Sequence, residues 1–105
     1  MTAKRKEETS EKQLRSMCKN IAQDITDGKE DASKWMEDVY NVRYIVDSEK
    51  KYLGAMLMVA GGGPTIWVNT WTSEVEGSWA GDRCTHYFQD NIGLDDYNEE
   101  TYNCS

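Results

Sequence analysis

Apolar side chains in the first third of the chain recur three and four positions apart, which is the spacing of one face of an α-helix. One such stripe consists of Leu14, Met17, Cys18, Ile21 and Ile25. It follows a capping-box pair, Ser10 and Gln13, and it ends at Gly28, a residue type that commonly closes helices. A second stripe consists of Ala32, Trp35, Met36, Val39 and Tyr40. The pattern predicts one helix from Ser10 to Gly28 and another over residues 30–40.

After these stripes the apolar period changes to two, which is the period of a β-strand. Strand-like runs lie at residues 42–47, 52–60, 65–71 and 75–79, and residues 84–88 can add a short edge strand. The loop Gly61-Gly62-Gly63-Pro64 lies between two of these runs and lacks the patterns of phosphate-binding loops. We therefore expect it to be a hairpin connection.

The chain closes with an acidic segment, residues 90–102, whose apolar members at helical spacing predict a short helix despite Gly93. The order of elements predicts an α+β fold with two layers: N-terminal helices, a four-stranded antiparallel meander and a short C-terminal acidic helix. Residues 1–9 are charged and lack apolar periodicity, so we expect a flexible tail there. Residues 10–105 are expected to form a single domain.

Charge is distributed unevenly along the 105 residues, whose formal net charge is −7. Residues 1–19 are basic overall, whereas residues 66–105 contain one basic residue, Arg83, and eight acidic ones. An acidic surface repels nucleic acid and anionic membranes and attracts basic protein surfaces. The alternative, that the acidity serves solubility alone, stays open.

The cellular location can be predicted from the apolar runs and the cysteines. No apolar run reaches the ~20 residues of a membrane span. Cys18, Cys84 and Cys104 are odd in number and far apart, which is typical of a reducing compartment. These features predict a cytoplasmic protein that does not associate with membranes.

Candidate catalytic and metal-binding residues are few. Cys84 and His86 share a face of the predicted edge strand, but a zinc site needs two further ligands, for which only Asp82 and Asp90 are near. A Cys–His nucleophile also needs an oxyanion donor. The paired carboxylates of residues 95–100 are more typical of a solvated helix face than of an acid–base pair. The sequence therefore predicts no enzyme, no metal site and no cofactor.

Tryptophans leave two interpretations open. Trp67 and Trp71 share one face of the third predicted strand, and Trp79 lies on the next strand. Large aromatic side chains can complete a small core, or they can anchor a protein interface.

A series of motifs in the second half of the chain resembles the pattern of a known protein family. Residues 58–70 read MVAGGGPTIWVNT, and they are followed by Val75-Glu-Gly-Ser-Trp79, Gly81-Asp-Arg83 and Tyr102-Asn-Cys104. This order resembles a family of small acidic proteins of bacterial phages, plasmids and integrative elements. The family pattern is an apolar strand, a GGP turn, an aromatic strand, a Trp-Gly-Asp-like corner and a closing acidic helix. The likeness covers roughly residues 35–104. The corner departs from the pattern, since it reads Trp79-Ala-Gly-Asp82, and Trp71 stands where a charged residue is commoner.

Some small acidic proteins of such elements are anti-CRISPR inhibitors, so the resemblance implies binding to guide-loaded Cas9. Cas9-type enzymes hold nucleic acid in basic channels and read a short PAM with arginines, and an acidic protein can compete for such surfaces as a DNA mimic. Blocking of a conformational step is another route to inhibition. The partner-binding residues predicted on this basis are Asp90, Asp95, Asp96, Glu99 and Glu100, with Glu74, Glu76, Asp82 and Trp71 as further candidates.

Two other functions stay open. The chain can bind a different basic nucleic-acid-processing protein of its host or element, such as a restriction enzyme, a replication protein or a repressor. It can also contact nucleic acid directly through the basic segment Lys4–Lys6 and exposed aromatic side chains, although the net charge opposes this.

Overall fold

The computed structural model describes residues 2–104, and it describes the side chains of residues 11–104. The elements are α1 Thr2–Asp27, α2 Ala32–Trp35, the 3-10 helix η1 Met36–Asp38, β1 Asn41–Val46, β2 Tyr52–Ala60, β3 Thr65–Asn69, β4 Glu74–Trp79, β5 Asp82–Tyr87 and α3 Leu94–Asn103. The strands form one antiparallel sheet in the order β1-β2-β3-β4-β5, so each strand pairs with the next along the chain. The fold is α+β, as predicted.

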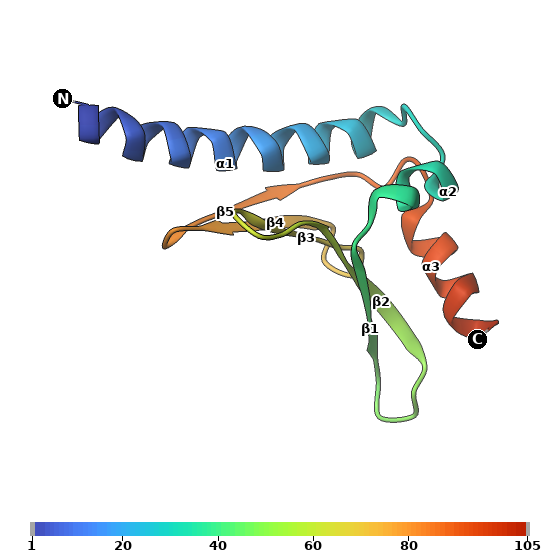
Figure 1. Ribbon diagram of the computed structural model, residues 1–105. Helices are drawn as coiled ribbons and strands as arrows, with labels where there is room; N and C mark the ends of the chain where they lie inside the picture. The colour runs from blue at the N-terminus through green and yellow to red at the C-terminus, as the bar shows by residue number, and fades with distance from the viewer. Residues whose placement is uncertain (1, 105) are drawn as a thin grey trace.

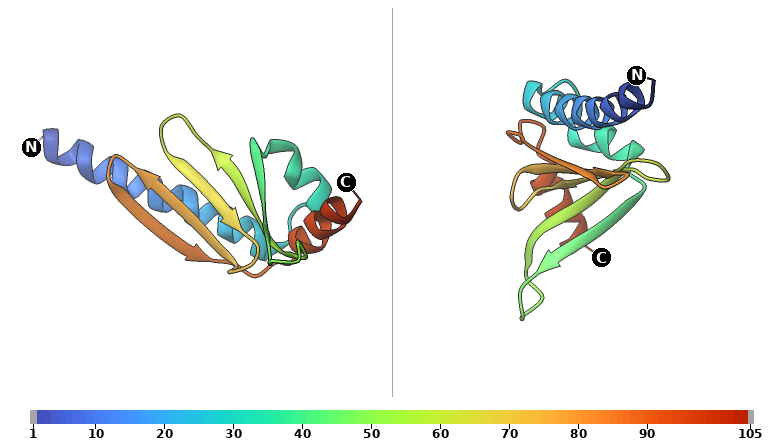
Figure 2. Two further views of the ribbon diagram at one scale, coloured as in Figure 1. Left: turned by 90° about the horizontal axis from the view of Figure 1, so that it is seen from below. Right: turned by 90° about the vertical axis from the view of Figure 1, so that its left-hand side faces the viewer.

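The helices lie on one side of this sheet (Figures 1 and 2). α1 runs along β4 and β5, α3 packs on β2, and α2 contacts α3. In Figure 1 the hairpin of β1 and β2 turns away from β3, β4 and β5, so the sheet bends, and both long helices lie outside the bend. The opposite face of the sheet carries no helix from residues 2–104.

The core lies between the helices and the sheet. The predicted apolar stripe of α1 is buried there, with Leu14, Cys18 and Ile25 at 1%, 0% and 0% exposure. The sheet and α3 contribute a second set of buried side chains, namely Ala55, Leu57, Ile66, Val68, Val75 and Leu94. Removing each large apolar side chain from water stabilises the fold by about 1.5–3 kcal/mol, so this one-sided burial accounts for the layered arrangement.

The meander has five strands, which corrects the four-stranded prediction. β5 pairs with β4 over its whole length, from Glu74 opposite Tyr87 to Trp79 opposite Asp82. Ala80 and Gly81 connect the two strands, and both have positive φ, 51° and 89°. A two-residue turn of this kind matches the twist of the adjoining strands, so the chain folds straight back into a full hairpin instead of bending away.

Several element boundaries differ from the predicted ones. α1 begins at Thr2, eight residues before the predicted cap at Ser10; residues 2–9 include Ala, Lys, Arg and Glu, which are good helix formers. The flexibility of residues 1–9 and the single domain of residues 10–105 stay predictions, and Met1 lies outside the described residues. β3 ends at Asn69 instead of residue 71, because Asn69 Oδ1 accepts the backbone N–H groups of Trp71 and Thr72, at 2.9 and 3.0 Å, and starts a turn.

The second and last helices are shorter than predicted. α2 is capped by Asp31, whose side chain accepts the Lys34 backbone N–H at 3.0 Å, and it tightens into η1 after one turn. α3 begins at Leu94 instead of residue 90, because Gly93 has a left-handed backbone with φ 79° and therefore lies outside the helix.

Candidate protein-binding surface

Asp90 caps the start of α3. Its carboxylate accepts the backbone N–H groups of Gly93, Leu94 and Asp95 at 3.0, 2.8 and 2.9 Å. The first N–H groups of a helix have no partner inside the helix, and the positive end of the helix dipole favours an anion at this place. Asp90 therefore has a structural role as a helix cap, and its contact with a partner stays a prediction.

Asp95 joins α3 to the sheet. Its Oδ1 accepts hydrogen bonds from the Tyr52 hydroxyl at 2.9 Å and from Thr70 Oγ1 at 2.8 Å, and Thr70 Oγ1 in turn accepts the Ala55 N–H at 2.8 Å. Burial raises the pKa of Tyr52 well above its usual range, and the Asp95 carboxylate raises this pKa further. Asp95 therefore also serves the fold.

Three predicted carboxylates remain on α3: Asp96, Glu99 and Glu100, which we call the α3 acidic surface. All three are exposed, and none takes part in the ion pairs found among side chains 11–104. Carboxylate oxygens of Asp95, Asp96 and Glu99 lie within 4.8 Å of one another. Like charges at this separation produce a strongly negative local potential, which attracts a basic partner.

The face of the sheet that carries no helix presents aromatic, sulfur-containing and charged side chains. Residues paired across strands point to the same side of a sheet. The strand register therefore places two rows on this face: Met58, Trp67, Glu76 and Thr85 in one, and Arg43, Met56, Asn69, Glu74 and Tyr87 in the other. Together with Trp71, these residues define what we call the open face.

The tryptophans divide between the core and the open face. Trp35 and Trp79 are partly buried against the core. Trp67 is half-buried on the open face, where the Arg43 guanidinium lies 5.0 Å from its ring centroid, a cation–π contact. Trp71 is 57% exposed, and its backbone passes so close to β2 that only a glycine, Gly54, fits beneath it. Trp35 and Trp79 thus complete the core, whereas an interface role for Trp67 and Trp71 stays a prediction.

The nine predicted partner-binding residues do not form one surface. Asp96, Glu99 and Glu100 lie on α3, on the helix side of the sheet, whereas Glu74, Glu76 and Trp71, which lies against Gly54, belong to the open face. Asp82 is opposite Trp79 at the far end of the β4–β5 hairpin, apart from both groups. The two surfaces lie on opposite sides of the sheet (Figure 1).

Cys84 is next to a second thiol, which the sequence did not indicate. Its Sγ atom lies 2.9 Å from Cys18 Sγ under α1, and both cysteines are free thiols. Burial, and then the hydrogen bond with Cys84, raises the pKa of Cys18 to about 12. A catalytic thiol needs a lowered pKa, so the environment of Cys18 disfavours nucleophilic chemistry.

None of the helices in the described chain has the length and apolar character needed to cross a membrane. Comparison with protein-family models, with curated proteins and with solved structures found no match to this chain. The α3 acidic surface and the open face are therefore the features from which function can be inferred.

Proposed function

We propose that this protein binds a basic surface of another protein and that the partner is guide-loaded Cas9, which it inhibits. The observation that carries the proposal is the α3 acidic surface, whose three carboxylates are exposed and have no cationic partner among side chains 11–104. Unpaired negative charge accelerates association with a positive surface and selects against acidic partners.

Two further features support this proposal. The net charge of −7 favours any basic partner over nucleic acid itself. The open face offers aromatic and methionine side chains beside the carboxylates of Glu74 and Glu76, a mixture that protein interfaces favour. The choice of Cas9 comes from the resemblance of roughly residues 35–104 to mobile-element proteins, and the basic DNA channels of Cas9-type enzymes fit an acidic partner physically.

A cleavage assay tests the proposal. The purified protein is titrated into several guide-loaded Cas9 orthologs before target DNA is added, and we expect a stoichiometric loss of cleavage with at least one ortholog. A gel shift with the same mixtures distinguishes blocked DNA binding from blocked cleavage. If no ortholog is inhibited, the partner is another basic protein, such as a restriction enzyme, a replication protein or a repressor, and a pull-down from the host is the next step.

Matched variants connect the result to the surface. The variant Asp96→Asn, Glu99→Gln and Glu100→Gln should inhibit weakly, because it neutralises the α3 acidic surface. A control with Asp27→Asn, Glu37→Gln and Glu49→Gln removes the same charge from exposed positions elsewhere and should inhibit normally.

A further inference from the structure

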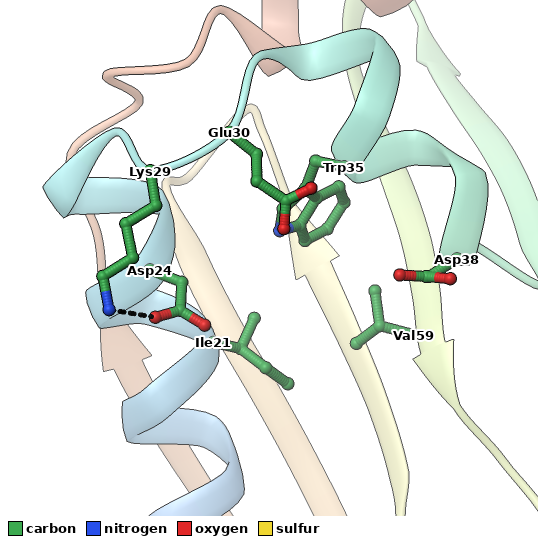
Figure 3. Close-up of a pocket in the computed structure, with 7 residues that line it drawn as sticks. All are labelled: Ile21, Asp24, Lys29, Glu30, Trp35, Asp38 and Val59. Carbon is green, nitrogen blue, oxygen red and sulfur yellow. Dashed lines mark ion pairs between the residues drawn. The ribbon is translucent and has the colours of Figure 1, made fainter.

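A pocket of about 240 Å³ lies between the end of α1, the α2–η1 segment and β2. Figure 3 shows the seven residues that line it, namely Ile21, Asp24, Lys29, Glu30, Trp35, Asp38 and Val59. None of them belongs to the α3 acidic surface or to the open face. The pocket is smaller than the ~300–1,000 Å³ of typical small-molecule sites, so it suits one inserted side chain better than a cofactor.

The apolar part of the pocket is held in place by the fold. Ile21, Trp35 and Val59 are partly buried and pack against the core, each from a different element. The backbone N–H of Trp35 also donates to the Asp31 carbonyl at 3.0 Å, which anchors the residue in α2. An aromatic side chain fixed in this way offers a ring to a ligand without a further loss of conformational entropy.

The charged part of the pocket has an uncompensated negative charge. Lys29 lies 3.6 Å from Asp24, and this ion pair neutralises one carboxylate. The side chains of Glu30 and Asp38 form no ion pair or hydrogen bond within the described part of the chain. In Figure 3 the Glu30 carboxylate is drawn next to the indole of Trp35 and the Asp38 carboxylate lies farther along the pocket, near Val59, while the Lys29–Asp24 pair lies to one side.

An indole that shares a pocket with two unpaired carboxylates matches the chemistry of a guanidinium group. This group is planar and permanently charged, so it stacks on an aromatic face while its N–H groups donate to carboxylates. A lysine ammonium can form the charge contacts but cannot stack, and a neutral ligand leaves the carboxylates unpaired. We infer that this pocket binds an arginine side chain presented by a partner protein. The inference does not depend on which basic protein that partner is.

An NMR titration of the full chain tests this assignment without Cas9. The probe is the capped tripeptide acetyl-Gly-Arg-Gly-amide, followed through the Trp35 indole N–H and the backbone amides of Glu30 and Asp38. We expect saturable shifts with the arginine peptide, weaker binding of the lysine peptide, and none with the citrulline peptide, which has the same shape without the charge. The variant Glu30→Gln/Asp38→Asn should bind at least about fivefold more weakly.

A second acidic variant controls for the general negative charge of the protein. Asp27→Asn/Glu49→Gln removes the same charge from exposed positions outside the pocket and outside the α3 acidic surface, and it should bind the arginine peptide as the unmodified chain does. The assignment is overturned if the shifts do not saturate, if the citrulline peptide produces them equally, or if this control variant loses as much affinity. Tighter binding of free L-arginine than of the peptide would indicate a small-molecule site and would also overturn it.

Discussion

At the residue scale, the neighbouring carboxylates Asp95 and Asp96 of α3 have different roles, one inside the fold and one at its surface. Leu94 and Asn98 are 0% and 1% exposed, so they mark the side of the helix that faces the core. Asp95 lies at the border of that side and reaches Tyr52 and Thr70, whereas Asp96 points to solvent. The helical rotation of about 100° per residue separates two adjacent aspartates into a structural group and a surface group.

Asp95→Ala should destabilise the fold by about 1–3 kcal/mol, because it leaves the Tyr52 hydroxyl and Thr70 Oγ1 without their acceptor in a partly buried place. Urea unfolding followed by circular dichroism measures the effect. Asp96→Ala is the matched control, since its carboxylate is exposed, and it should change the free energy of unfolding by less than about 0.5 kcal/mol. Equal losses in the two variants would contradict the role of Asp95.

The buried thiol of Cys18 predicts a loss of stability at alkaline pH. Its pKa is about 12 in the folded protein, against about 8.5 for an unfolded cysteine. Because the folded value is raised, this stabilising contribution is complete below the unfolded pKa and is lost as pH rises from about 9 towards 12. The slope is about 1.4 kcal/mol per pH unit in this window.

Urea unfolding at about pH 8 and about pH 10 measures this slope. Cys18→Ala should show a smaller loss of stability between the two pH values than the unmodified chain. Cys104→Ala, which replaces an exposed thiol, should keep the full loss. The same slope in all three proteins would show that Cys18 does not determine the pH dependence.

Element-scale features that follow from periodicity could be predicted from the sequence. The bounds of β2, Tyr52–Ala60, agree with the prediction, and the stripe of α1 is buried as expected. Both patterns are direct consequences of burial. The full length of β5 could not be predicted in the same way, because it depends on a left-handed backbone at Ala80, a residue type that rarely adopts one.

The candidate sites were only partly predictable. The acidic residues of α3 are evident in the sequence, but the internal role of Asp95 depends on hydrogen bonds to residues 25 and 43 positions away. The pocket lined by Trp35, which we call the Trp35 pocket, likewise combines side chains from α1, α2 and β2. These elements are brought together only by the fold. The one local signal for it was a tryptophan within a strongly acidic segment, residues 30–38.

Gly77 allows α1 to lie close to β4, so Gly77→Ala should destabilise the fold. The new Cβ would lie 2.5 Å from Cys18 Sγ and 3.0 Å from Leu14 Cδ1, and overpacking of this kind costs about 1–3 kcal/mol. Adding Cys18→Ala removes the closest atom, so the double variant should lose less stability than the sum of the losses of the two single variants. Thermal unfolding of the four proteins measures this coupling.

A glycine in open surroundings provides the control for this cycle. The nearest heavy atom to a Cβ at Gly63 is Trp79 Nε1 at 3.9 Å, and Gly63 is not among the glycines with positive φ. Gly63→Ala should therefore leave stability within about 0.5 kcal/mol of the unmodified chain. A loss at Gly77 no larger than this would show that α1 adjusts its position without cost.

At the scale of the whole molecule, two negatively charged features lie on the same side of the sheet. α2 contacts α3, and Asn98 donates to Met36 Sδ at 3.6 Å, so the segment that forms the Trp35 pocket adjoins the helix that carries the α3 acidic surface. The open face lies on the other side and offers aromatic and sulfur-containing side chains together with the charges of Arg43, Glu74 and Glu76. A basic partner is therefore expected to approach from the helix side, where charge attracts it over the longest distance.

Charge reversal tests this orientation without disturbing the fold. The variant Asp96→Lys, Glu99→Lys and Glu100→Lys leaves the cap Asp90 and the partly buried acceptor Asp95 intact, so its circular dichroism should match that of the unmodified chain. Its affinity for the basic partner, which we propose to be Cas9, should fall at least about tenfold, because the reversed charges repel a basic surface. Association of the unmodified chain should also slow between about 50 mM and about 500 mM salt, whereas the variant should depend less on salt. A folded variant that inhibits Cas9 fully would show instead that the partner binds elsewhere, and the open face, with Trp67 and Trp71, would then be the surface to mutate.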